Sequence, residues 1–267
     1  MLKRVTCRSW EDFKIECQKL FEGVKQWQTA AQPSGISKPI FRGVPDESWG
    51  LQTTLERCTS REYTPEEYWK VMRAVSPAVQ SLTGKVWKLN NEFTESRGYP
   101  TVQDPEFMIY LRHHGFPSPL LDWTASPFVA AFFAFRSKNI CKADNVAIYS
   151  YVEFCGHGKA WTDAEPAVFT VGNYVATDRR HHIQQCQYSF ALKRSDDEVV
   201  YCNHESVFAS DDDEQDVLTK YIIPSSERQK VLRELNFMNV NAYSLFGDED
   251  GLMETLAFKE IEEREKE

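Results

Sequence analysis

The first half of the chain alternates between helical periodicity and short breaks. Residues 8–31 place apolar side chains near every third or fourth position, which predicts an amphipathic helix with Ser9 as its N-cap. Residues 32–39 are expected to form a loop, and residues 40–46 a short strand that runs into a turn. Thr64 and Pro65 then predict a helix over residues 64–91, which Pro77 breaks or kinks.

Two further helices are predicted around the longest apolar run. Asp104 and Pro105 begin a short helix that stops at Gly115. Ser126 and Pro127 form the clearest cap in the chain, because serine is a preferred N-cap and proline suits the first helical position. The residues that follow are apolar almost all round, so a buried central helix is expected over residues 127–137.

The second half of the chain is dominated by strand-like segments. Runs with a period of two occur at residues 146–154, 168–174, 188–193, 199–202 and 218–224. An acidic loop (210–216) precedes the last strand, and helices are expected at residues 226–239 and within 244–258 before a charged tail that frays. Helices first, mostly strands afterwards and helices again at the C-terminus indicate an α+β fold rather than alternating βαβ units.

Composition excludes several classes of protein. The chain has 267 residues, 42% of them hydrophobic and 27% charged, which is typical of a soluble globular protein. The net charge of −9 argues against salt-driven capture of nucleic acid, except through a local basic patch. The seven cysteines form no CxxC pair, and no signal peptide or run of ~20 apolar residues occurs. A cytoplasmic protein with reduced thiols and no membrane partner is expected.

The polar segment before the buried helix is the main candidate for chemistry. Helix N-termini bind phosphates and carboxylates, and Thr124 and Ser126 lie at one. Asp122 would repel a phosphate but would hold a ribose hydroxyl, an arginine or a backbone amide, and Trp123 offers a flat face for a ring. The alternative is that Ser126 is only a cap, Asp122 forms an Asx-turn and Trp123 belongs to the core.

Other chemistry finds little support in the sequence. His113–His114 and His181–His182 are adjacent pairs, whereas a helical zinc pair prefers positions i and i+4, so no metal site is predicted. Motifs of phosphate loops, serine hydrolases, zinc proteases and dinucleotide-binding folds do not occur in the sequence.

Several motifs together resemble the FRG domain family, named for its Phe-Arg-Gly motif. Phe41-Arg42-Gly43 matches that signature, and HHGFPSPLLDWTASPFVAAFFA (113–134) matches the specific Leu-Leu-Asp-Trp-Thr block. Segments 51–57, 179–190 and 222–256 are similar to further family motifs. The resemblance implies an FRG domain over residues 35–258, an N-terminal helical segment over 1–34 and a charged tail over 259–267. Departures from the pattern are Arg112, Ser118-Pro119 and Tyr188.

A weaker resemblance connects the chain with ADP-ribosyltransferases of the Arg-Ser-Glu class. Their first strand carries an arginine that grips dinucleotide phosphates, as Arg42 would here, and residues 122–134 look like a variant of their strand and short helix. The resemblance implies a central, mostly antiparallel sheet of ADP-ribosyltransferase-like type and NAD as cofactor, without a metal. The catalytic glutamate has no secure match: Gln184, Gln185 and Gln187 occupy the comparable region.

The missing glutamate leaves three possibilities open. Asp122 supplies the negative charge, Glu198 or Glu205 folds in, or the site binds without catalysing. The residues with expected catalytic roles are Arg42, Asp122, Thr124, Gln185 and His114. The residues with expected cofactor-binding roles are Phe41, Arg42, Gly43, Arg57, His113, Trp123, Ser126 and Arg180. For Arg42 the alternative is a structural arginine paired to a buried carboxylate, with Asp122 as the candidate.

Three functions follow from these patterns. The first is an NAD-using ADP-ribosyltransferase-like enzyme or NAD glycohydrolase that acts as a bacterial or phage-defence toxin on a protein or nucleic-acid acceptor. The second is a non-catalytic module that binds a nucleotide or another phosphorylated ligand. The third is a nucleic-acid-acting effector that uses the four histidines of the two pairs with Arg112, Arg179 and Arg180.

Overall fold

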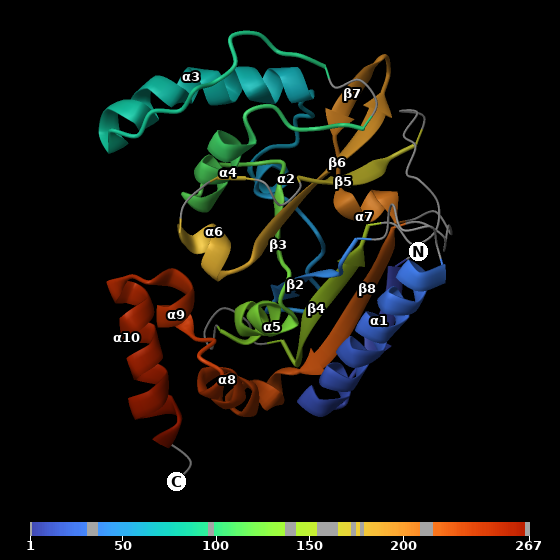
Figure 1. Ribbon diagram of the computed structural model, residues 1–267, viewed down its shortest axis with the longest axis vertical. Helices are drawn as coiled ribbons and strands as arrows, with labels where there is room; N and C mark the ends of the chain where they lie inside the picture. The colour runs from blue at the N-terminus through green and yellow to red at the C-terminus, as the bar shows by residue number, and fades with distance from the viewer. Residues whose placement is uncertain are drawn as a thin grey trace.

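One sheet organises the molecule. The computed structural model describes residues 2–30, 37–95, 99–136, 143–153, 165–171, 175–176, 179–208 and 216–264. Within them, eight strands follow the order β1–β8–β4–β2–β3–β6–β5, with β7 beside β6 (Figure 1). The strands are β1 (Leu2–Thr6), β2 (Ile40–Val44), β3 (Leu121–Thr124), β4 (Asn145–Val152), β5 (Ala167–Thr170), β6 (Cys186–Ser195), β7 (Glu198–Tyr201) and β8 (Val217–Pro224).

Helices pack against the sheet, and the last of them follow β8 in the sequence. They are α1 (Trp10–Ala30), α2 (Thr54–Cys58), α3 (Pro65–Thr83), α4 (Pro105–His113), α5 (Pro127–Phe135), α6 (Arg179–Ile183), α7 (His204–Val207), α8 (Arg228–Phe237), α9 (Ala242–Phe246) and α10 (Glu249–Ala257). The fold is therefore a mixed α+β fold with an open, mostly antiparallel sheet, and this much of the predicted fold class is confirmed.

The predicted strands are all present, and two further strands join them. The five period-two runs and residues 40–44 form strands close to the expected positions. β1 was not predicted because residues 2–6 show no alternation of apolar and polar side chains; it pairs in parallel with β8, which lies more than 200 residues later in the sequence. The loop over residues 32–39 and the acidic loop 210–216 lie mostly outside the described residues.

Two helical predictions need correction. The helix that begins after Thr64 passes through Pro77 and ends at Thr83, where Gly84 adopts a left-handed φ of 67°, so it does not reach residue 91. The charged tail was expected to fray, yet residues 258–262 form a π-helical turn. Arg228 pairs with Glu262 across 2.5 Å, and this ion pair holds the turn against α8.

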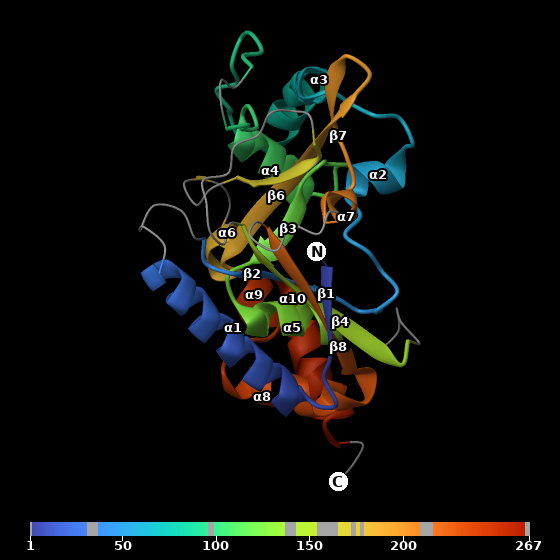
Figure 2. The ribbon, with the colours of Figure 1, turned by 90° about the vertical axis from the view of Figure 1, so that its right-hand side faces the viewer.

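The sheet consists of two halves that meet between β2 and β3. β2 pairs with β4 at five positions but with β3 at one, Phe41 opposite Thr124. Figures 1 and 2 place α1, α5 and α8 beside the half that contains β8, β4 and β2, and α3 and α4 beside the half that contains β6, β5 and β7. Each half buries its own cluster of aromatic side chains, so the junction between them is a natural place for a cleft.

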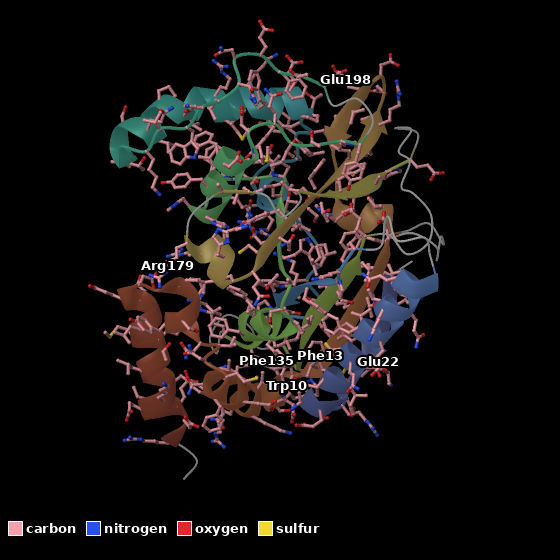
Figure 3. All side chains as sticks on the ribbon, viewed as in Figure 1. Trp10, Phe13, Glu22, Phe135, Arg179 and Glu198 are labelled. Atoms are coloured by element: carbon pink, nitrogen blue, oxygen red, sulfur yellow. The ribbon has the colours of Figure 1, made fainter. Side chains whose placement is uncertain are left out.

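Helix α5 is the predicted buried central helix, and it lies directly on β2. Ser126 caps it by accepting a hydrogen bond from the amide of Val129. Trp10 and Phe13 of α1 belong to the same core cluster as Phe135, and Figure 3 shows these three side chains in the layer between α1 and α5. Burial of these apolar surfaces fixes α5 against the strand that carries Arg42.

Gly43 permits this close approach. A Cβ at this position would lie 1.9 Å from the carbonyl oxygen of Ala130 and 2.7 Å from the amide nitrogen of Ala134. Both atoms belong to the backbone of α5 and cannot rotate away. The glycine of the Phe-Arg-Gly signature is therefore required by packing between strand and helix.

We predict that Gly43→Ala lowers the free energy of unfolding by about 2–4 kcal/mol, because the helix must move off the strand. Urea denaturation measures the change. Gly23→Ala is the matched control: a Cβ there meets nothing within 4 Å, so the substitution should raise stability by roughly 0.5–1 kcal/mol. Equal denaturation midpoints for Gly43→Ala and the wild type would contradict the packing argument.

Candidate ligand pocket

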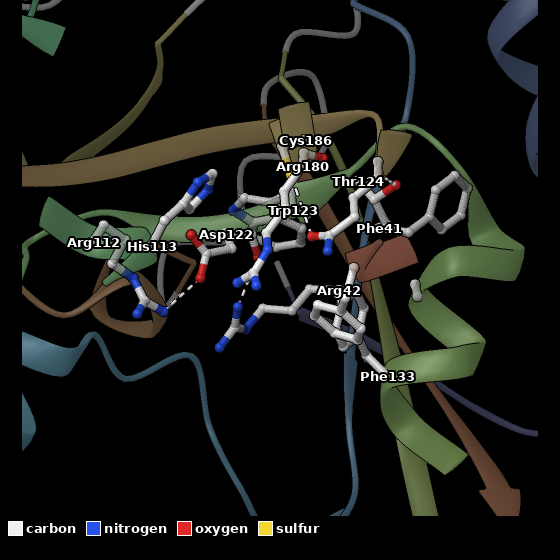
Figure 4. A pocket seen from close by; sticks show the side chains of 14 residues that line it. Phe41, Arg42, Arg112, His113, Asp122, Trp123, Thr124, Phe133, Arg180 and Cys186 are labelled. Carbon is white, nitrogen blue, oxygen red and sulfur yellow. Dashed lines mark hydrogen bonds and ion pairs between the residues drawn. The ribbon is translucent and has the colours of Figure 1, made fainter. Parts of the chain in front are cut away.

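A pocket of about 350 Å³ opens at the junction of the two half-sheets. Most of its wall comes from β2, α4, β3 and α5, and the rest from α6, β6 and α9 (Figure 4). The lining residues are Phe41, Arg42, Gly43, Arg112, His113, Asp122, Trp123, Thr124, Ala130, Phe133, Arg180, Gln184, Cys186 and Phe246.

Arg42 bridges the gap where the pairing of β2 with β3 stops. Its Nη1 donates a 2.7 Å hydrogen bond to the backbone carbonyl of Asp122. Its Nε is buried and has no hydrogen-bond partner among the described residues. The pKa of Arg42 is lowered to about 10, chiefly by burial; the charge of Asp122 opposes this shift, whereas those of Arg112 and Arg57 contribute to it. A buried cation with a spare donor favours an anion beside it.

Asp122 and Arg112 form the second element of the pocket. Arg112 Nη2 lies 2.5 Å from Asp122 Oδ2, and the side chains are 13% and 34% exposed. Among the described residues, Arg112 Nε and Asp122 Oδ1 are buried without hydrogen-bond partners. The alternative for Arg42 was an ion pair with the carboxylate of Asp122. In the structure Arg42 donates to the backbone carbonyl of Asp122, and Arg112 forms the ion pair with its carboxylate.

The charges that line the pocket are mostly positive. Arg42, Arg112 and Arg180 contribute three guanidinium groups, whereas Asp122 is the single carboxylate among the described lining residues. Arg180 also pairs with Asp248 at 2.6 Å, at the start of α10. The pocket therefore suits an anion with several oxygens, for which planar guanidinium groups are the preferred partners.

An aromatic wall faces these charges. Phe133 of α5 and Phe246 of α9 pack edge to face with ring centroids 6.1 Å apart. The guanidinium of Arg180 lies 5.5 Å from the Phe246 ring. The buried Gln184 holds α9 in place by donating from Nε2 to the carbonyl of Leu245 at 3.0 Å. The C-terminal helices thus supply part of the pocket.

The structure brings together eight of the residues expected at the site. These are Phe41, Arg42, Gly43, His113, Asp122, Trp123, Thr124 and Arg180. Trp123 and Thr124 have structural partners: the indole, 3% exposed, donates to Ser189, and the Thr124 hydroxyl donates to the carbonyl of Gln184. Little of the indole face is open to a bound ring.

Four expected residues do not line the pocket. His114 and Arg57 are exposed, with His114 against Tyr110 and Arg57 bonded to the carbonyl of Gln52. Ser126 is the cap of α5, and Gln185 is exposed with a left-handed φ of 50°. Neither Glu198 nor Glu205 lines the pocket either: Glu198 is the first residue of β7, near the top of the view in Figure 3, and Glu205 accepts a hydrogen bond from the amide of Leu51.

Sequence reasoning missed part of the wall. Arg112 was noted as a departure from the family pattern and as a basic residue of the nucleic-acid hypothesis, not as the partner of Asp122. Gln184 was considered beside Gln185, and the turn after α6 decides which of the two faces inward. Phe133 and Phe246 lie within the family motifs but were not expected at the site, because apolar residues on helices are usually core.

Comparison with known proteins supports the family resemblance. The family model of the FRG domain matches residues 37–142, so the chain contains an FRG domain. Neither a curated protein nor a solved structure gives a significant match. The matched residues include Arg42, Arg112 and Asp122, whereas Arg180, Gln184 and Phe246 lie beyond them.

The described residues offer neither a membrane-spanning helix nor a cluster of metal ligands. No helix there has both the length and the apolar character needed to cross a bilayer. No group of three or more histidine, cysteine, aspartate or glutamate side chains there is arranged to hold a metal ion.

Behind β3, a buried histidine supports the pocket. Trp123 Nε1 donates to Ser189 Oγ at 2.7 Å, and Ser189 Oγ lies 2.9 Å from His204 Nε2. Burial lowers the pKa of His204 to about 3, with a smaller contribution from the charge of Arg42. The neutral imidazole can then accept a hydrogen bond from the serine hydroxyl, which completes a chain of hydrogen bonds from β3 to α7.

We predict that this histidine makes the fold sensitive to acid. The unfolded chain binds a proton at His204 below about pH 6.5 and the folded chain does not until about pH 3, so stability falls as pH decreases through that window. The slope approaches about 1.4 kcal/mol per pH unit. Urea denaturation between pH 7 and 4 should show a shallower loss for His204→Gln than for the wild type. His182→Gln, at an exposed histidine, is the control and should follow the wild type.

Proposed function

We propose that this pocket binds a phosphate-bearing nucleotide, with NAD as the ligand. The observation that carries the proposal is the buried Nε of Arg42, which has no hydrogen-bond partner among the described residues, in a pocket that holds three guanidinium groups. Phosphate oxygens satisfy such donors and offset the cost of burying the cations. The weaker resemblance to ADP-ribosyltransferases supports NAD, because their strand arginine grips the phosphates of that dinucleotide.

The remaining wall fits the other parts of a nucleotide. The phosphates would contact Arg42, Arg112 and Arg180, and a ribose hydroxyl would donate to the free Oδ1 of Asp122. Phe133 and Phe246 offer the aromatic surface on which a base or a nicotinamide ring can pack. About 350 Å³ is near the lower end of ligand pockets, enough for the phosphates and one nucleoside.

A second proposal is that the protein cleaves NAD as an ADP-ribosyltransferase-like enzyme. The observation in its favour is the position of Asp122, a carboxylate in the pocket wall with one buried oxygen that has no hydrogen-bond partner in the described part of the chain. The bond between nicotinamide and ribose C1′ would break, with nicotinamide leaving with the electron pair. The carboxylate would stabilise the positive charge that develops on the ribose, and an acceptor nucleophile would attack C1′ and lose its proton.

The expected acceptor is a protein, a nucleic acid or, for a glycohydrolase, water. The resemblance implied a sheet of ADP-ribosyltransferase-like type, and that finer assignment is part of this proposal.

The role as a bacterial or phage-defence toxin stays a prediction, and cytoplasmic expression of the wild type beside Asp122→Asn tests it by its effect on growth. If the protein cleaves NAD with the help of the Asp122 carboxylate, the wild type should slow growth and the variant should not.

We predict that Arg42→Ala and Arg180→Ala each weaken binding of NAD or ADP-ribose at least tenfold, which corresponds to about 1.4 kcal/mol. Isothermal titration calorimetry measures the affinity, and circular dichroism checks the fold. Arg179→Ala is the matched control, because Arg179 precedes Arg180 on α6 but is exposed and does not line the pocket. Absence of binding by the folded wild type would refute the proposed function.

We predict that Asp122→Asn separates binding from catalysis. The amide keeps the size of the side chain but removes its charge, so ADP-ribose binding should persist or tighten while nicotinamide release from NAD falls at least a hundredfold. Chromatography measures the nicotinamide released from NAD in reactions that contain cell lysate as the source of acceptors. Binding without release by the wild type would identify a non-catalytic module, and unchanged release by the variant would exclude Asp122 as the stabilising charge.

A further inference from the structure

A chain of three side chains leads from the pocket into the core. His113 Nε2 lies 2.9 Å from Tyr188 Oη, and Tyr188 Oη lies 3.1 Å from His181 Nδ1. His113 lines the pocket, whereas Tyr188 and His181 are 1% and 6% exposed. The ring of His181 also stacks on that of Tyr188 with centroids 5.7 Å apart. A phenol is thus held between two imidazoles, one facing the ligand site and one buried.

The chemistry of the three groups fixes how protons can be arranged. A phenol has one proton, so it donates to one imidazole nitrogen and accepts from the other. When His113 is an imidazolium, its Nε2–H donates to Tyr188, and Tyr188 donates to Nδ1 of His181. The chain can therefore hold an added proton at the pocket end without losing either hydrogen bond.

The surroundings of His113 set when that proton is favoured. Arg112 on the same helix, Arg42 on β2 and Arg180 on α6 are cations that line the pocket with it. Asp122 on β3 is the opposing charge; it lies opposite Tyr188 in the register of β3 and β6 and is engaged by Arg112. An anion that binds among the arginines adds negative charge beside His113 and favours the imidazolium.

We propose that binding of an anionic ligand in the pocket takes up a proton, which His113 carries while Tyr188 and His181 position it. The proposal rests on the proposed function, since it requires a phosphate-bearing ligand in the same pocket. His113 then contacts the anion as a fourth cation, and Tyr188 and His181 are positioning residues. Imidazole is suited to this role because it gains a proton near neutral pH.

The direction of the pH dependence follows from linkage. Proton uptake on binding means that affinity rises as pH falls, by at most about tenfold per pH unit, over the range from roughly pH 8 to 6. The arginines do not change charge in this range, so they contribute no slope.

The test uses calorimetry of the full chain with ADP-ribose as the probe, at pH 7 in two buffers of different ionisation enthalpy. The difference in observed enthalpy gives the number of protons taken up, and we expect a value between zero and one for the wild type. His113→Gln should abolish the uptake, and Tyr188→Phe should reduce it by at least half while binding persists. Tyr201→Phe, at a buried tyrosine of β7 that does not line the pocket, is the matched control and should keep the uptake.

The outcomes distinguish this inference from the proposed function. If ADP-ribose does not bind, the proposed function fails. If it binds with no proton uptake by the wild type at pH 6, 7 and 8, the role of His113 is refuted while the ligand site stands. Should Tyr188→Phe take up as many protons as the wild type, Tyr188 and His181 have no positioning role. Histidine NMR titration with and without ADP-ribose provides a second readout, in which the signal of His113 should shift toward the protonated form on binding.

Discussion

The hydrogen bond from Arg42 to the carbonyl of Asp122 connects the two halves of the sheet. β2 and β3 pair at one position, and the ladder does not continue beside it. The guanidinium spans the gap with one nitrogen, and its buried Nε has no partner within the ranges that the structure describes. Structure and ligand binding therefore share one side chain: the arginine that joins the strands also carries the positive charge that an anion would meet.

The remainder of the pocket depends on elements that approach this junction from both sides. Gly43 lets α5 lie on β2, which brings Phe133 to the wall. Gln184 attaches α9 through Leu245, which brings Phe246 opposite. Each contact is local and modest, but together they enclose the arginines in a partly apolar space, where electrostatic interactions are stronger than in water.

Local signals predicted much of this arrangement. The Ser126–Pro127 cap, the apolar run behind it and the period-two strands required only neighbouring residues, and all of these elements are present. The family motifs singled out Arg42 and Asp122, and both line the pocket. The pairing of Arg112 with Asp122 could not be predicted, because it joins α4 to β3 and depends on their packing. Likewise, whether Gln184 or Gln185 lines the pocket depends on the left-handed backbone conformation of Gln185, which two identical side chains do not predict.

The wall of the pocket is assembled from segments spread along the chain, from Phe41 on β2 to Phe246 on α9. A ribosome delivers these segments in order, and the aromatic residue of α9 emerges long after Arg42. Strand β1 leaves the ribosome before β8 and must also wait for it before it can pair. A nascent chain thus has no complete ligand site until α9 has been made, so any activity of this pocket would begin only after that point of synthesis.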